Sequence, residues 1–261
     1  MQFREFHDRI ALVTGAGSGI GAAVARALAA NGATVAALDR DAERLRATVE
    51  KIRSDDHRAT AYEVDVSDRA RVERVVDRVE TELGPISYLV NSHGVLHVGE
   101  VTALADEQWT ECLEVNATGV FLVTRAVVGR MTSRAAGAVV NIASNVVGTA
   151  RSGMSAYSAS KAAVSAFTRC LALEVAPHGI RCNLVAPGST DTPMLRALWP
   201  DGDAVSASIA GRPEAYRVGI PLGKVAQPGE VADAVLYLLS DRASHITMQQ
   251  LTVDGGATLG V

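Results

Sequence analysis

Tyr157 and Lys161 lie four residues apart in the stretch MSAYSASKAAVSAF, residues 154–167. On a helix, side chains at this spacing share one face and lie one turn apart. An ammonium group beside a phenol favours the phenolate and lowers the pKa of the tyrosine. The pair is therefore a candidate proton-transfer device. A surface helix with a solvated lysine and a half-buried tyrosine gives the same spacing, so the rest of the chain must decide between the two interpretations.

The elements that must position this pair follow a regular order of short apolar runs and helical periods. We expect strands at residues 9–15, 33–39, 59–66, 86–94, 137–144 and 180–188 and in the closing QQLTVDGG. We expect helices at residues 19–32, 41–53, 67–84, about 107–133, 155–179 and 228–240. Strands that alternate with helices are typical of a parallel sheet covered on both faces. The sequence therefore predicts one α/β domain over residues 1–261, a doubly wound Rossmann fold with about seven strands.

Residues 189–223 interrupt this order. They contain Pro193, Pro200, Pro213 and Pro221, several glycines and no clean helical or strand period. A long segment of this kind inside a compact domain is usually a functional loop. We expect a lid or substrate loop at residues 189–223.

Composition limits the classes of function. Of the 261 residues, 48% are hydrophobic and 21% are charged, which suits a large buried core. The formal net charge is -4 with no basic block, so we expect no nucleic acid or membrane as a partner. Cys112, Cys170 and Cys182 are scattered, which suits a reducing compartment and offers no metal site. Without a signal-peptide pattern or an apolar run of membrane-spanning length, the chain is predicted to be soluble and cytoplasmic.

A glycine-rich turn, TGAGSGIG (14–21), follows the first strand and opens the first helix. Missing side chains let the backbone approach a pyrophosphate, which binds the N–H groups at the positive end of a helix. The strand–turn–helix context makes this motif far more specific than glycines alone. The residues of the turn that we expect to bind the cofactor are Gly15, Ser18, Gly19, Ile20 and Gly21.

Asp39 ends the second strand, 20 residues after Gly19. A carboxylate there accepts hydrogen bonds from the ribose hydroxyls of NAD and repels the 2′-phosphate of NADP. An aspartate that caps the helix starting near Asp41 is the alternative. Arg40 complicates the choice because its guanidinium could hold a phosphate. Asp39 carries more weight in our interpretation, and the predicted cofactor is NAD, with Arg40 beside it.

Two further strand ends are expected at the same edge of the sheet, where ligands bind in open α/β folds. Asp65 and Val66 would flank the adenine, and Asn91 and Gly94, in the sequence NSHG, would pass under the adenosine ribose.

Four polar residues, Asn116, Ser144, Tyr157 and Lys161, occur in an order and at intervals that resemble the short-chain dehydrogenase/reductase family. The resemblance covers essentially the whole chain, from TGAGSGIG through YSASK and PGSTDT to VDGG. It implies that Tyr157 is the general acid/base and that Lys161 lowers its pKa and binds the nicotinamide ribose. It also implies that Ser144 holds the reacting oxygen and that Asn116 holds a water that links Lys161 to solvent.

The same resemblance extends to the cofactor and to assembly. It implies that Thr190 and Thr192, which follow Pro187 and Gly188, orient the nicotinamide carboxamide. Members of the family are usually homotetramers joined through the long helices and the C-terminal strand and helix. The apolar ending ATLGV suits burial in a neighbouring subunit.

Several segments also resemble 2,3-dihydro-2,3-dihydroxybenzoate dehydrogenases of catecholate siderophore pathways, among them SGMSAYSASKAA, IRCNLVAPGSTDTPM and SHITMQQLTVDGGATLGV. This implies oxidation of the C3 hydroxyl of a cyclohexadiene carboxylate, followed by tautomerisation to an aromatic acid. The substrate would be a small cyclic carboxylate, and Arg151 is the candidate for its carboxylate because an arginine can bind this group through two hydrogen bonds. A solvated surface Arg151 is equally compatible with the sequence. Met154, Leu195, Leu198 and Trp199 are candidates for the apolar walls.

Two histidines depart from these patterns. His93 stands where the family has a small residue, and His97 stands where the dihydroxybenzoate enzymes carry arginine. They are either structural histidines or substrate contacts that indicate a changed substrate. Trans-2,3-dihydro-3-hydroxyanthranilate, with an amine at C2, is the alternative substrate, and its product would be 3-hydroxyanthranilate. A non-catalytic NAD-binding sensor or scaffold is an alternative of another class, although such proteins usually lose the Tyr or the Lys.

Overall fold

The computed structural model describes residues 4–198 and 203–260. Its strands are β1 (Ile10–Thr14), β2 (Thr34–Asp39), β3 (Ala59–Glu63), β4 (Ile86–Asn91), β5 (Gly137–Ile142), β6 (Ile180–Pro187) and β7 (Gln250–Val253). Its helices are α1 (Gly19–Ala30), α2 (Ala42–Ser54), α3 (Arg69–Glu82), α4 (Asp106–Leu113), α5 (Gly119–Arg134), α6 (Ser155–Val175), α7 (Pro193–Arg196), α8 (Ala204–Ala210) and α9 (Pro228–Leu239). The strands pair in the order β3-β2-β1-β4-β5-β6-β7, and every pairing is parallel. The predicted seven-stranded parallel sheet is confirmed.

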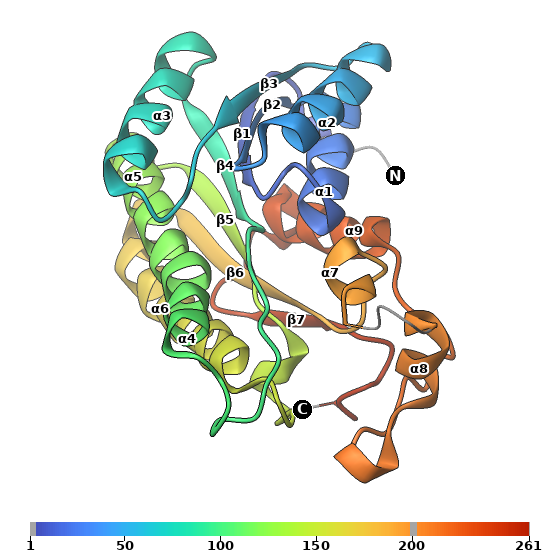
Figure 1. The fold of residues 1–261 in the computed structure, drawn as a ribbon. Helices are drawn as coiled ribbons and strands as arrows, with labels where there is room; N and C mark the ends of the chain where they lie inside the picture. Colours follow the sequence, from blue (N-terminus) through green and yellow to red (C-terminus); the bar gives the residue numbers. More distant parts are fainter. Residues whose placement is uncertain (1–3, 199–202, 261) are drawn as a thin grey trace.

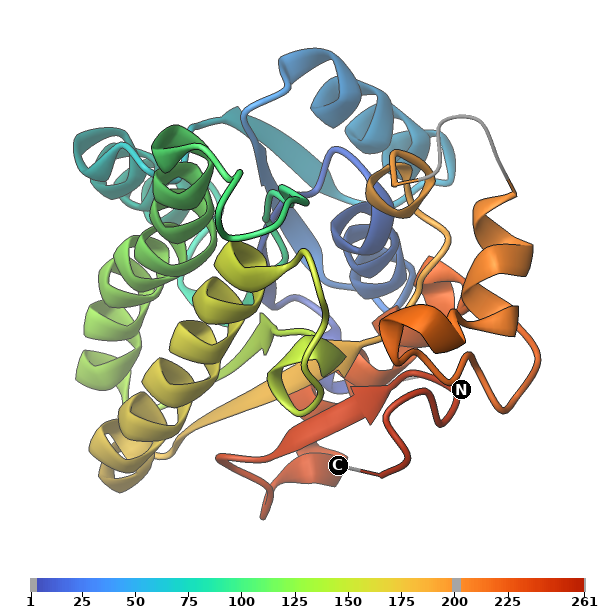
Figure 2. The ribbon, with the colours of Figure 1, turned by 60° about the horizontal axis from the view of Figure 1, so that its bottom comes forward.

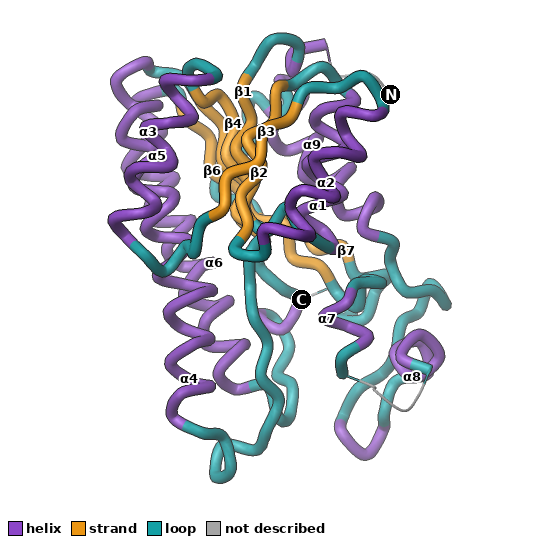
Figure 3. The backbone as a smooth tube through the Cα atoms, turned by 45° about the horizontal axis from the view of Figure 1, so that its top comes forward, coloured by secondary structure: helices purple, strands orange, loops and turns teal. Residues whose placement is uncertain are grey.

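Helices cover both faces of this sheet, as Figures 1 and 3 show. On one face, α1, α2 and α9 bury a cluster that includes Val13, Leu28 and Val235. On the other, α3, α5 and α6 bury a second cluster that includes Leu12, Val76 and Val127. Every residue of β1 is buried, which explains why the central strands lack a polar alternation.

A continuous helical stretch runs from Asp106 to Arg134, where the sequence predicts one long helix. Within it, Glu114–Thr118 form a π-helical turn between α4 and α5. Contrary to the sequence-based expectation, the stretch is long and apolar enough to cross a membrane. However, 56% of its apolar window is buried inside the protein, which is typical of a core helix that packs against a sheet.

The carboxyl ends of the strands open at one edge of the sheet. The chain order reverses between β1 and β4, because β2 and β3 lie on one side and β5 and β6 on the other. Such a reversal leaves a crevice outside the strand ends, where ligands bind in this class of fold. Residues 189–198 and 203–223 lie at this edge, as Figure 2 shows.

The described residues 189–198 and 203–223 contain the short helices α7 and α8 and a 3-10 turn at Pro213–Ala215, where the sequence shows no period. Both helices are specified by caps rather than by apolar spacing. The Thr192 side chain accepts a hydrogen bond from the Leu195 N–H, and the Asp203 carboxylate accepts bonds from the N–H groups of Val205 and Ser206. The function of this segment as a lid stays a prediction.

Candidate active site

A cavity of about 440 Å³ opens at this edge of the sheet. It is lined from the glycine-rich turn before α1 to the N-terminal end of α6 and the segment 189–223. The predicted site residues in its lining are Gly15, Ser18, Gly19, Ile20, Gly21, Asp39, Arg40, Asp65, Val66, His93, Gly94, Ser144, Arg151, Met154, Tyr157, Lys161, Pro187, Gly188, Thr190 and Thr192. Three predicted site residues, Asn91, Asn116 and His97, are not part of that lining.

Two glycines of the glycine-rich turn have no room for a side chain. A Cβ on Gly21 would lie 2.1 Å from the carbonyl oxygen of Gly15, and Gly15 itself has a φ of +65°. Ser18 is the N-cap of α1 but its side chain makes no capping hydrogen bond, and the first turn contains no acidic residue. The positive end of this twelve-residue helix therefore faces the cavity without a side-chain anion of its own.

Asp39 is held at the adjoining corner of the cavity. Its two carboxylate oxygens accept hydrogen bonds from the N–H groups of Gly17 and Asp41, both at 2.9 Å. The helix cap that the sequence left open for Asp39 belongs instead to Asp41, whose side chain accepts from Glu43 and Arg44 N–H groups. Asp39 is thus oriented toward the glycine-rich turn rather than used to start α2.

Arg40 points toward helix α4 rather than being solvated alone. Its guanidinium lies 3.6 Å from one carboxylate oxygen of Glu111, and His97 Nε2 lies 2.7 Å from the other oxygen. Because His97 is engaged with Glu111 outside the cavity lining, the structure does not support its predicted role as a substrate contact.

Asn91 lies deeper than the cofactor role predicts. Its Nδ2 donates to Thr124 Oγ1 at 2.9 Å and to Asn141 Oδ1 at 2.8 Å. These bonds join β4 to β5 and α5 in the protein interior, so Asn91 supports the strand end instead of lining the cavity. Asp65, by contrast, remains at the cavity, with one oxygen bound to the Ser67 N–H and hydroxyl.

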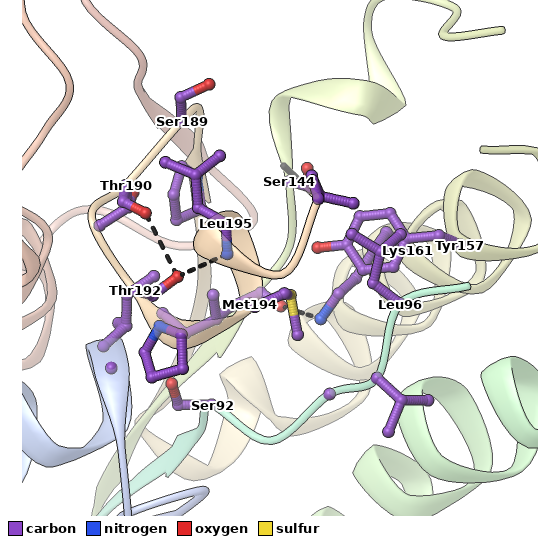
Figure 4. Close-up of a pocket in the computed structure, with 18 of the residues that line it drawn as sticks. Ser92, Leu96, Ser144, Tyr157, Lys161, Ser189, Thr190, Thr192, Met194 and Leu195 are labelled. Atoms are coloured by element: carbon purple, nitrogen blue, oxygen red, sulfur yellow. Dashed lines mark hydrogen bonds between the residues drawn. The ribbon is translucent and has the colours of Figure 1, made fainter. Parts of the chain in front are cut away.

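Ser144, Tyr157 and Lys161 meet at the inner end of the cavity, opposite Thr190 and Thr192 (Figure 4). The Lys161 ammonium donates to the Ile142 carbonyl at 2.9 Å and lies 5.8 Å from the centroid of the Tyr157 ring. The helix α6 gives this spacing, because residues four apart share one of its faces.

The expected depression of the Tyr157 pKa is wrong for this state of the protein. Burial raises the pKa of the phenol to about 12, and a hydrogen bond with Ser144 opposes that rise only in part. Burial also lowers the pKa of Lys161 to about 8, since an ammonium group loses its hydration there. Loss of water therefore sets the direction of both pKa shifts, and the argument from spacing did not include it.

Asn116 lies in the π-helical turn and is fully buried. Its Nδ2 donates to the Val95 carbonyl and to Ser160 Oγ, both at 2.9 Å, and its Oδ1 accepts from the Val95 N–H at 2.7 Å. The side chain therefore holds the loop after β4. A Cβ on Gly94 would lie 3.3 Å from Asn116 Oδ1 and 3.5 Å from Lys161 Nζ, so the absence of that side chain keeps open the space between the two polar groups.

His93 turns into the interior. Its Nδ1 lies 2.6 Å from Thr14 Oγ1, while its buried Nε2 has no hydrogen-bond partner of normal geometry among the described residues. A Cβ on Gly119 would lie 3.0 Å from Nε2, so the ring occupies space that only a glycine leaves in α5. Burial, aided by the charge of Lys161, lowers the pKa of His93 to about 3. The ring is neutral and is held by Thr14, and because His93 also lines the cavity, its substrate contact stays a prediction.

The predicted substrate residues Arg151 and Met154 line the cavity just before α6, and Leu195 and Leu198 also belong to its lining. Trp199 lies outside the described residues. The Arg151 guanidinium is half-buried, and burial lowers its pKa, so the solvated surface arginine that the sequence allowed is not what the structure contains.

Sequence analysis missed three residues that shape the site. Ser160, one residue before Lys161, accepts a hydrogen bond from Asn116, and Thr14 contacts His93. Ser160 belongs to the motif YSASK and Thr14 begins TGAGSGIG, so both motifs could have indicated them. Arg217 also lines the cavity, from a stretch without any sequence pattern. Among residues 4–198 and 203–260, no group of His, Cys, Asp or Glu could hold a metal ion.

These features fit a nicotinamide dinucleotide. The uncapped end of α1 suits a pyrophosphate, and the Asp39 carboxylate suits ribose hydroxyls. Lys161 and Thr190 lie opposite each other in the same cavity. The wall residues at Gly15 and Gly19 have positive φ angles and leave the backbone bare for close approach.

Comparisons with known proteins agree with this geometry. The family model described as short chain dehydrogenase matches residues 9–203. The chain is 47% identical over 261 residues to the 2,3-dihydro-2,3-dihydroxybenzoate dehydrogenase of Bacillus subtilis strain 168, with 100% of both chains covered. It is 41% identical to the enzyme of the same name from Escherichia coli K12, covering 98% of this chain and 99% of that one. The crystal structure of levodione reductase superposes with a TM-score of 0.90 at 31% identity, covering 98% of this chain and 100% of that chain. The chain belongs to the short-chain dehydrogenase family.

Proposed function

We propose that this protein oxidises the C3 hydroxyl of 2,3-dihydro-2,3-dihydroxybenzoate with NAD and forms 2,3-dihydroxybenzoate. The observation that carries the proposal is the 47% identity over the whole chain to a dehydrogenase named for that substrate. The cavity supports it, because Ser144, Tyr157 and Lys161 share one space with Arg151, a cation suited to a carboxylate.

The residues of the chain divide the reaction between them. Ser144 hydrogen-bonds the C3 oxygen, and the Tyr157 oxygen, once deprotonated, takes the hydroxyl proton. The buried ammonium of Lys161 stabilises the phenolate, and the space beside Gly94 leads from it toward Asn116. A nicotinamide held beside Lys161 and Thr190 would supply the acceptor for the hydride from C3. The resulting ketone tautomerises to an aromatic ring, which makes the oxidation effectively irreversible.

The first test is NAD reduction by purified protein. We expect NADH to form with 2,3-dihydro-2,3-dihydroxybenzoate and much more slowly with trans-2,3-dihydro-3-hydroxyanthranilate. The two histidines that suggested the amino substrate have other partners, because His93 contacts Thr14 and His97 contacts Glu111. Preferential oxidation of the amino acid would contradict the proposed substrate, and no oxidation of either acid would contradict the proposed reaction.

The preference for NAD rests on two arrangements at the outer end of the cavity. Asp39 is fixed where a 2′-phosphate would have to approach a carboxylate. Arg40, the cation that could accept such a phosphate, is directed to Glu111. A 2′-phosphate would therefore meet the Asp39 carboxylate, while the Arg40 guanidinium is paired with Glu111. This arrangement supports NAD as the cofactor.

Glu111→Gln is expected to raise kcat/KM for NADP by roughly fivefold, while kcat/KM for NAD changes little. The variant releases Arg40 from a partly exposed ion pair, which is worth at most about 1 kcal/mol. Steady-state kinetics with both cofactors measure the effect, and Glu107→Gln on the same helix is the control. An unchanged NADP efficiency would show that Glu111 does not withhold Arg40.

Assembly and location remain predictions. Large apolar side chains are exposed on α5, α6 and the C-terminal strand, among them Phe121, Leu173 and Leu251, which suits a homotetramer joined through these elements. Cytoplasmic location is the expectation from the sequence.

A further inference from the structure

A short hairpin in the segment after α8 carries Arg217 to the cavity. The backbones of Arg212 and Arg217 pair through two hydrogen bonds, of 2.9 and 3.0 Å. Two glycines fix its base: a Cβ on Gly211 would lie 2.4 Å from the Gly219 nitrogen, and a Cβ on Gly219 would lie 2.3 Å from the Ile209 carbonyl oxygen. The position of Arg217 is therefore set by backbone packing.

Arg217 faces the turn that precedes the catalytic helix. Its guanidinium lies 3.4 Å from the sulfur of Met154, the residue before α6. The Met154 N–H in turn bonds the Arg151 carbonyl at 3.2 Å. Arg151 thus belongs to the turn that ends at Met154, and Arg217 contacts this turn from the hairpin. Met154 lies three residues before Tyr157. Figure 2 shows the orange hairpin segment across from the yellow-green loop before α6.

Neither arginine has an acidic partner at ion-pair distance within the described ranges 4–198 and 203–260. The carboxylate that acts on Arg151 from a distance is Asp254, whose oxygens already accept from Asn145, Gly256 and Thr258. Arg212, which also belongs to the cavity lining, is paired with Glu214 instead.

The two guanidinium groups also repel each other. Burial lowers the pKa of Arg217, and the charges of Arg151 and Arg212 lower it further. Two half-buried cations that line one cavity without a counter-ion are destabilising unless an anion binds between them. The sulfur of Met154 is only a weak acceptor, so most of the five N–H donors of Arg217 remain available.

We propose that Arg217 is a second arginine for the substrate carboxylate, and that Arg151 and Arg217 bind it together at the end of the cavity beside Met154. The inference rests on the proposed function for the identity of the ring that bears the carboxylate. It assigns to the hairpin a direct part in choosing anionic over neutral substrates.

Binding of 2,3-dihydroxybenzoate and of catechol, which lacks the carboxylate, tests the proposal by titration calorimetry with the intact protein. Arg217→Gln is expected to weaken binding of the acid by about 10- to 100-fold, the effect of losing hydrogen bonds to a charged group. Arg217→Lys keeps the charge but loses the fork and is expected to weaken it by roughly three- to tenfold. Binding of catechol should be the same in all three proteins.

Arg196→Gln is the matched control, because Arg196 is an exposed arginine on α7, pairs with Asp191 and is not part of the cavity lining. It should bind the acid as the wild type does. Equal binding of the acid by wild type and Arg217→Gln, equal losses for acid and catechol, or no binding of the acid by wild type would each overturn the inference. The proposed function fails separately: the wild-type protein would then bind the acid through Arg217 but would not reduce NAD.

Discussion

Tyr157→Phe is expected to lower kcat for oxidation of 2,3-dihydro-2,3-dihydroxybenzoate by roughly 10³- to 10⁴-fold. The hydroxyl of Tyr157 lies at the cavity within hydrogen-bonding reach of Ser144, where the reacting oxygen must be held. The phenylalanine ring keeps the volume of the side chain, so neither the cavity nor helix α6 should change. Stopped-flow or steady-state NADH formation measures the rate.

The control for this variant separates chemistry from binding. NAD affinity of Tyr157→Phe should stay within about threefold of wild type by calorimetry, since the ring and Lys161 remain in place. Tyr237→Phe, on α9 with a partly exposed side chain, should retain full activity. If Tyr157→Phe oxidised the acid at more than a tenth of the wild-type rate, Tyr157 would not be the base. If neither the wild type nor Tyr157→Phe oxidised the acid, the sensor interpretation would fit instead.

The pH profile of the same reaction follows from the two pKa shifts. Tyr157, with a pKa raised to about 12, is protonated near neutrality, so the phenolate fraction grows about tenfold for each pH unit. Lys161 loses its positive charge as pH rises through about 8, and with it goes the stabilisation of the phenolate. We expect kcat/KM of the wild type to rise with pH up to about 8 and then to level off, and we expect no such rise in Tyr157→Phe.

His93 should make the fold sensitive to acid. Its pKa is about 3 in the folded protein and about 6.5 in an unfolded chain, so between these values the unfolded state binds a proton that the folded state excludes. Stability is therefore fully present above about pH 6.5 and is lost as pH falls toward about 3. The loss from this one group approaches about 1.4 kcal/mol per pH unit.

His93→Ala isolates this contribution. Urea unfolding at several values between pH 7.5 and pH 4 should give a shallower fall in the free energy of unfolding for the variant than for wild type, by up to about 1.4 kcal/mol per pH unit. His178→Ala, at an exposed position, should keep the wild-type slope. Parallel slopes for wild type and His93→Ala would mean that the ring is not held neutral by burial.

Local chemistry explains which parts of the site were predictable. Gly15, Gly21, Asp39 and the ends of the strands follow from rules about backbone approach, helix ends and sheet edges, and the structure places them at one cavity. Helical spacing places Tyr157 and Lys161 on one face, and the order of Asn116, Ser144, Tyr157 and Lys161 identifies the pair as catalytic candidates. These features depend on residues close in sequence, or on a sheet order that alternation of elements specifies.

Side-chain direction and solvation were not predictable. His93 turns inward because Thr14 and the bare backbone at Gly119 receive its ring, and these three residues are distant in sequence. His97 is drawn outward by Glu111 for a similar reason. The pKa of Tyr157 depends on how much water the surrounding elements exclude, which spacing does not reveal.

Residues 189–223 show a third limit. Their helices are short and set by caps, and Arg217 is placed by contacts between backbone atoms of Gly211 and Gly219. No hydrophobic period accompanies such structure, so only composition was readable from the sequence.

The glycine-braced hairpin also bears on how this enzyme could change its substrate over evolutionary time. Because its frame depends on Gly211 and Gly219, substitutions at these two positions should be selected against in any descendant that keeps the loop. Residue 217 has no such constraint, because it lines the cavity and its φ lies outside the left-handed region, whereas the neighbouring Tyr216 has a φ of +55°. A lineage could therefore exchange the charge at position 217 and sample uncharged or cationic substrates without rebuilding the fold around it.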